Sequence, residues 1–176
     1  MNYRENLSIL GGVLTLVSTY FFAFYQSGLA YAYGYGALFR ISLMFRDASS
    51  YGSQFGIPVF LVYFIAVALF VFLLSGIFQI LIVFSRGLAI IGSLFVLSGA
   101  IFLFLVHSEI FSIDFTIYEL IFIWDPIIGD ILPFHVEIAT YSLGTYILLI
   151  GGLLGLIGGI LARDKTVSKS LDDNFK

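Results

Sequence analysis

Four long runs of apolar residues dominate the pattern of this chain. The runs cover about residues 7–25, 57–84, 87–106 and 141–162, and none of them contains Asp, Glu, Lys, Arg or His. A helix needs about 20 apolar residues to cross the hydrocarbon of a bilayer while it satisfies its own backbone hydrogen bonds. The pattern therefore predicts an all-α membrane protein, a single domain over residues 1–176 built as a bundle of four transmembrane helices.

The connections between these runs differ in length. Ser85, Arg86 and Gly87 leave room only for a tight hairpin between the second and third helices, so these two are predicted to be antiparallel neighbours. The other connections, 26–56 and 107–140, are long, and four crossings place both on the same side of the membrane. A tail, 163–176, follows the fourth helix.

Both long loops alternate apolar and other residues with the period of a β-strand. The alternating residues are Tyr31, Tyr33 and Tyr35, then Phe39, Ile41, Leu43 and Phe45 within 38–46, and Phe111, Ile113, Phe115 and Ile117 in the second loop. The two loops are therefore predicted to form a small extracytoplasmic β-sheet that caps the helices. Helix is the alternative for either loop, for example an amphipathic helix over 110–124 that lies in the membrane interface.

The positive charges predict the orientation of the chain in the cell membrane. Six of the eight Lys and Arg residues lie in the N-terminal segment, the short hairpin and the tail, and only Arg40 and Arg46 lie in the long loops. Positive residues are retained on the cytoplasmic side, so both termini are predicted to be cytoplasmic. The first apolar run is longer than a signal-peptide core of about 7 to 15 residues, which favours an uncleaved anchor.

Small residues form a stripe along the fourth predicted helix. At 100° per residue the stripe contains Gly144, Gly151, Gly155, Gly158 and Ala162. Such a stripe lets another helix backbone approach closely, which is how helices with small residues associate in lipid. The first helix offers a matching face with Ser8, Gly11, Thr15 and Ser18. The stripe is therefore predicted either to pack the helices of this chain or to receive a helix of a partner.

The composition limits the classes of protein and of site that this chain can represent. The chain is 60% hydrophobic and 11% charged, and it has a net charge of -3 and no cysteine. Soluble domains are roughly 45 to 50% apolar and 25% charged, so this composition is that of a membrane protein. The absence of a basic run and of cysteine excludes nucleic-acid binding and a disulfide scaffold. The sequence predicts no catalytic residue, metal site or cofactor.

These observations predict a non-catalytic subunit of a larger membrane assembly, whose partners are the bilayer and other membrane subunits or copies of itself. Its contact surface is predicted to be the glycine stripe or the aromatic residues Tyr31, Tyr33, Tyr35 and Trp124. One alternative is a redox subunit that holds haem or a quinone through His107 or His135, the only histidines. Another is a small oligomeric channel lined by Ser8, Thr15 and Ser18.

Overall fold

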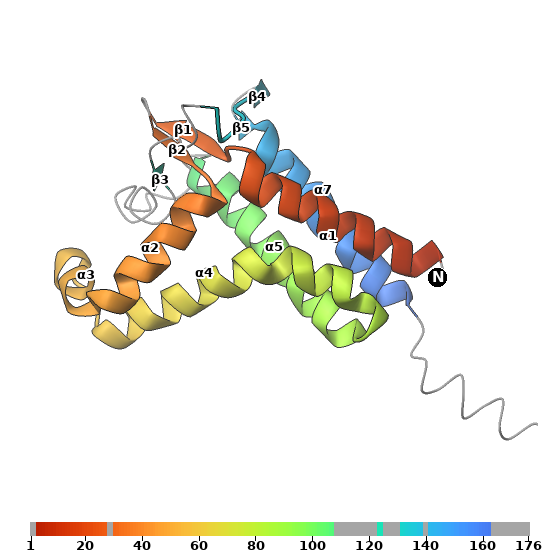
Figure 1. Cartoon of the computed structure of the whole chain (residues 1–176), viewed down its shortest axis with the longest axis horizontal. Coiled ribbons are helices and arrows are strands. Elements are labelled where there is room, and N and C mark those ends of the chain that lie inside the picture. Colours follow the sequence, from red (N-terminus) through yellow and green to blue (C-terminus); the bar gives the residue numbers. More distant parts are fainter. Residues whose placement is uncertain (1–2, 28–29, 108–122, 125–130, 139–140, 163–176) are drawn as a thin grey trace, which may run out of the picture.

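The computed structural model describes residues 3–27, 30–107, 123–124, 131–138 and 141–162 (Figure 1). Within these residues the chain is mostly helical, with two small sheets. In chain order the elements are α1 (Tyr3–Phe21), β1 (Tyr25–Ser27), β2 (Ala30–Ala32), α2 (Gly34–Arg46), α3 (Ala48–Phe55), α4 (Val59–Ile80), the 3-10 helix η1 (Leu81–Val83), α5 (Arg86–His107), β3 (Ile123–Trp124), β4 (Glu137–Ile138), β5 (Tyr141–Ser142) and α7 (Leu143–Leu161).

Three helices among the described residues are long and apolar enough to cross a membrane. They cover Val59–Val83, Arg86–Leu105 and Leu143–Leu161, close to three of the predicted runs. The remaining run, 7–25, also falls largely on a helix, α1, but this helix is less apolar than the other three. It begins at Tyr3 and carries Arg4 and Glu5 in its first turn, and its buried face consists of hydroxyl residues and glycines.

The four long helices contact one another in a closed cycle. α1 packs along α7 and α4, and α5 packs along α4 and α7. α4 and α5 are joined by η1 and form the tight hairpin that the sequence predicts. The starts of α1 and α5 and the end of α7 lie together beside this hairpin. We call this end of the helices the hairpin end. The strands gather at the opposite end of α1, which we call the sheet end (Figure 1).

Both long loops contribute to one small sheet at the sheet end, as predicted. Its order is β1-β2-β3, with both pairs antiparallel and Tyr31 opposite Trp124. β4 and β5 form a second, two-stranded sheet that leads into α7. The backbone of Phe134 bonds to Phe21 and Ala23, and so ties the second loop to the end of α1. The predicted strand over 111–118 lies outside the described residues.

The prediction of a strand over 38–46 is wrong, because these residues belong to the helix α2. α2 buries Gly34, Ala37, Ile41 and Met44, which recur at helical spacing, and also Gly36. It packs against α4. Leu38, Phe39 and Phe45 are exposed. A helix satisfies its own backbone, whereas a strand needs a partner along each edge. Apolar residues on several faces of α2 produce an alternation that resembles a strand.

α2 and α3 return the chain to the start of α4. α3 ends at Gly56, whose φ of 63° is the left-handed conformation that glycine adopts without a steric cost. Pro58 then occupies the N-cap of α4. A continuous core joins α2 and α4 to α5 and α7, and it includes Ile41, Phe72 and Leu148. The segment α2–α3 is thus held against the first half of α4 (Figure 1).

Candidate functional site

The glycine stripe of α7 is occupied by α1 of the same chain. A Cβ atom on Gly151 would lie 2.7 Å from Thr15 Oγ1, and one on Gly158 would lie 2.5 Å from the backbone nitrogen of Ser8. Gly144 contacts Ala23, just beyond α1. Ala162 is also buried, in a cluster with Ile82 and Ala89. The stripe therefore packs helices within the chain, and α1 fills the groove that an external helix would need.

Ser8, Thr15 and Ser18 of α1 bond to the neighbouring helices through their hydroxyl groups. Ser8 Oγ donates to the backbone oxygen of Gln79 at 2.9 Å, and Ser18 Oγ donates to that of Gly144. From the other side, Thr145 Oγ1 donates to the backbone oxygen of Phe24 at 3.0 Å. Because Ser8, Thr15 and Ser18 are fully buried inside one chain, they do not line the lumen that the oligomeric-channel alternative requires.

Gln79 of α4 has the largest of the buried polar side chains between α1 and the neighbouring helices, and it is fully buried. Its side chain lies beside Gly155 and Ser93, since a Cβ on Gly155 would be 2.6 Å from both Gln79 Cδ and Ser93 Oγ. Its Oε1 accepts a long hydrogen bond of 3.5 Å from Thr15 Oγ1, and its Nε2 has no partner among the described residues. The side-chain amide of Gln79 therefore contributes more through packing than through hydrogen bonding.

We expect Gln79→Met to leave the free energy of unfolding within about 1 kcal/mol of wild type, because methionine has a similar shape and removes an unpaired buried donor. Gln79→Ala should lower it by about 2 kcal/mol or more, since alanine leaves a cavity between α4 and α7. Unfolding in mild detergent measures both variants. If the methionine variant were as unstable as the alanine variant, the amide would have an essential bonding role.

Two arginines bond to the last turn of α7. Arg86 donates from Nε to the Gly159 oxygen at 2.9 Å and from Nη2 to the Ile160 oxygen at 3.0 Å, and Arg4 Nη1 donates to the Leu161 oxygen at 3.1 Å. The last carbonyls of a helix lack intrahelical donors and carry partial negative charge. The arginines therefore satisfy and neutralise this end. Their charge is evident from the sequence but their partner is not, since 73 residues separate Arg86 from Gly159.

The three tyrosine side chains that were predicted to form an outer contact surface are buried or half-buried. Tyr33 is fully buried, so its prediction as an outer contact is wrong. Tyr31 is half-buried with its ring 5.5 Å from that of His135, and Tyr35 is half-buried with its ring 5.4 Å from that of Tyr20. The tyrosine alternation ends when Gly34 begins α2, so these side chains share no common face. Trp124 pairs with Tyr31 through its backbone, and its side chain lies outside the described residues.

A different group of apolar residues is exposed at the sheet end. We call it the cap strip, and it consists of Ile131, Phe134, Val136 and Ile138. Ile131 exposes 60% of its surface, and both residues of β4 are exposed. Phe134, Val136 and Ile138 alternate with Pro133, His135 and Glu137, and this alternation is the sequence signal that could have identified the strip. The strip was not among the contact surfaces predicted from the sequence.

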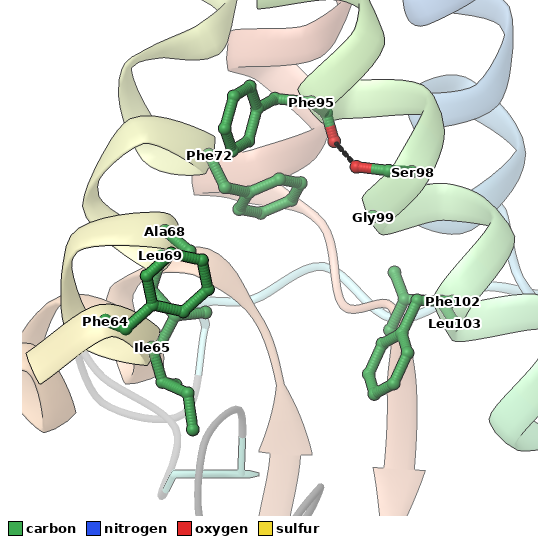
Figure 2. Close-up of a pocket in the computed structure, with 10 residues that line it drawn as sticks. All are labelled: Phe64, Ile65, Ala68, Leu69, Phe72, Phe95, Ser98, Gly99, Phe102 and Leu103. Atoms are coloured by element: carbon green, nitrogen blue, oxygen red, sulfur yellow. Dashed lines mark hydrogen bonds between the residues drawn. The ribbon is translucent and has the colours of Figure 1, made fainter. Parts of the chain in front are cut away.

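A lateral pocket lies where α4 and α5 diverge from their hairpin. Its volume is about 260 Å³. Figure 2 shows its lining, which is Phe64, Ile65, Ala68, Leu69 and Phe72 from α4 facing Phe95, Ser98, Gly99, Phe102 and Leu103 from α5. Phe72 packs against Gly99, where a Cβ would lie 2.6 Å from the ring carbon Cε2. Ser98 Oγ donates to the backbone oxygen of Phe95 at 2.9 Å.

The described residues bring no metal-binding group together, in the sense of three or more His, Cys, Asp or Glu side chains. Of the two histidines that the redox alternative names, His107 or His135, the second lies beside Tyr31. The side chain of His107, at the end of α5, lies outside the described residues.

Comparison with known proteins assigns the chain to no family. No protein-family model, curated protein or solved structure matches it.

Proposed function

We propose that this chain is a non-catalytic, multi-pass membrane protein that serves as an accessory subunit of a larger membrane assembly and contacts its partner through the cap strip. The exposure of the cap strip is the observation that supports this function. Apolar side chains exposed along a spanning helix are covered by lipid, whereas those beyond the helix ends meet headgroups and water. Clustered exposed apolar residues in such a place mark interaction surfaces.

The backbone of the strip supports the same role. β4 pairs with β5 in a sheet of two strands, so β4 has an open edge among the described residues. An open edge strand can accept a strand from another chain, and alternating side chains such as Val136 and Ile138 then provide selectivity. The partner is another membrane subunit or a second copy of this chain.

We further propose that α1 is the fourth transmembrane helix and that the sheet end faces outward. The packing of α1 against α4 and α7 supports this arrangement, because its hydroxyl residues Ser8, Thr15 and Ser18 are buried and hydrogen-bonded rather than exposed to lipid. The positive charges support the orientation. Arg4 and Arg86 lie at the hairpin end, and positive residues near helix ends favour the cytoplasmic side.

The double substitution Phe134→Ser and Ile138→Ser should abolish the assembly without unfolding the chain, because both side chains are exposed. Purification in mild detergent followed by native mass spectrometry measures the species that remain bound. The matched control is Tyr3→Ser at the hairpin end, where the side chain is 74% exposed, and this variant should keep the assembly. A cap-strip variant that retains every partner of the wild type would contradict the proposal.

A further inference from the structure

We propose that the lateral pocket between α4 and α5 holds one acyl chain of a bilayer phospholipid. The pocket is separate from the cap strip, and this proposal does not depend on the function proposed above. It rests on the level of the pocket along the helices, the chemistry of its lining and the surroundings of its mouth.

The pocket lies at the depth of the hydrocarbon. At a rise of 1.5 Å per residue, Phe64 and Phe72 lie about 8 and 20 Å along α4 from Val59. On α5, Phe95 and Leu103 lie about 14 and 26 Å from Arg86. Both helices are long and apolar enough to span a bilayer, whose hydrocarbon is about 30 Å thick. The pocket is therefore open to molecules dissolved in the hydrocarbon, of which acyl chains are the most abundant.

The lining matches an uncharged hydrocarbon chain. Nine of its ten residues are apolar or glycine, and the hydroxyl of the tenth, Ser98, already donates to a carbonyl of its own helix. Among the residues that the structure describes, none that lines the pocket is charged. A buried water needs two to four polar partners, which this lining does not offer. An empty space of this size would forfeit dispersion contacts along all of its walls.

The mouth of the pocket continues into the lipid-facing surface of the helices. Phe64 on α4 and Phe102 on α5 both line the pocket (Figure 2), and both are exposed, Phe64 with 68% of its surface. Phe60 and Ile101 extend the exposed apolar surface on either side. The deeper residues Leu69 and Leu103 are buried, so a molecule that contacts them must enter between α4 and α5.

The driving force for occupancy is packing rather than transfer from water. The interior of the bilayer is as apolar as the pocket, so moving a lipid tail from one to the other brings no hydrophobic gain. Filling the space restores the dispersion contacts of Phe72, Leu69 and Leu103. We therefore expect the bound chain to exchange with the bilayer, and we expect it to hold α4 and α5 apart as a wedge.

The test uses the full chain in phosphatidylcholine vesicles that carry a photoreactive diazirine in the middle of one acyl chain. Illumination followed by peptide mass spectrometry maps the adducts. We expect adducts on Leu69 and Leu103 in the pocket and also on Ile157, an exposed residue of α7 that reports ordinary contact with lipid. Adducts on Ile157 without adducts on the pocket residues would overturn the proposal.

Two variants that fill the pocket sharpen the test. Ala68→Phe from α4, or Ser98→Leu from α5, should remove the pocket adducts and leave those on Ile157. The control Val67→Phe adds bulk one residue away, on an exposed side chain outside the lining, and it should leave both sets of adducts. Pocket adducts that persist in both filled variants would show that lipid reaches Leu69 and Leu103 by another route, and would also overturn the proposal.

Discussion

Replacing Gly11 with leucine should separate α1 from α7 and lower the free energy of unfolding by about 3 kcal/mol or more. The Cβ of any side chain at this position would lie 2.5 Å from the backbone nitrogen of Gly155 and 2.6 Å from the backbone oxygen of Gly151. These are backbone atoms, so they cannot turn aside as a flexible side chain does. Overpacking of a core costs about 1 to 3 kcal/mol when side chains can adjust, and more when they cannot. Unfolding in mild detergent gives the free energy.

The chain offers a matched control for this substitution. Gly87, near the start of α5, is exposed, and among the described residues its Cβ would meet only Ser85 Oγ, at 3.8 Å. Gly87→Leu should be neutral or slightly stabilising, because leucine favours helix over glycine by up to about 1 kcal/mol. Equal stability of the Gly11 and Gly87 variants would mean that α1 does not pack into the glycine stripe of α7.

Arg86→Ala should also destabilise the chain strongly, with a loss of about 1.5 to 3 kcal/mol in the free energy of unfolding. The substitution removes two charge-assisted hydrogen bonds to the end of α7. It also removes the attraction between the guanidinium charge and the helix dipole, and the two contributions together account for a loss of this size. Arg86→Lys should lose less, since it keeps the charge but not the planar fork that reaches two carbonyls. The same unfolding measurement ranks the variants.

Arg4 and Arg46 provide the comparison for Arg86. Arg4 makes one exposed bond to the Leu161 oxygen, so Arg4→Ala should cost less than Arg86→Ala and its cost should shrink as salt is added. Arg46 is exposed at the end of α2, and its replacement by alanine should change little. An Arg86→Ala protein as stable as the Arg46→Ala protein would exclude a role for Arg86 as a cap on α7.

The features that follow from local rules were predictable from the sequence. The three most apolar helices follow from the length that hydrocarbon demands, and the pairing of α1 with α7 follows from small residues repeated at helical spacing, such as Gly151 and Gly155 facing Gly11. That both long loops contain strands was predicted from their alternation, but the positions differ. β1 and β2 occupy 25–27 and 30–32, residues 38–46 are helical, and the strand predicted over 111–118 lies outside the described residues.

The remaining features depend on how distant elements meet. Apolar alternation did not distinguish α2 from a strand, because α2 packs one face on α4 and leaves other apolar residues exposed. The bonds from Arg86 join parts of the chain that no local pattern connects. The lateral pocket results from the divergence of α4 and α5 around Phe72 and Gly99, and that divergence is a property of packing rather than of either helix alone.

The pairing of α1 with α7 imposes an order of events when the chain is made. Ser18 and its acceptor Gly144 are 126 residues apart, and a ribosome adds about 5 to 20 residues per second. After α1 is synthesised, about ten seconds therefore pass before α7 follows. α4, which also packs against α1, is synthesised earlier than α7. During that interval the face of α1 that holds Gly11 lacks the helix that covers it in the finished chain.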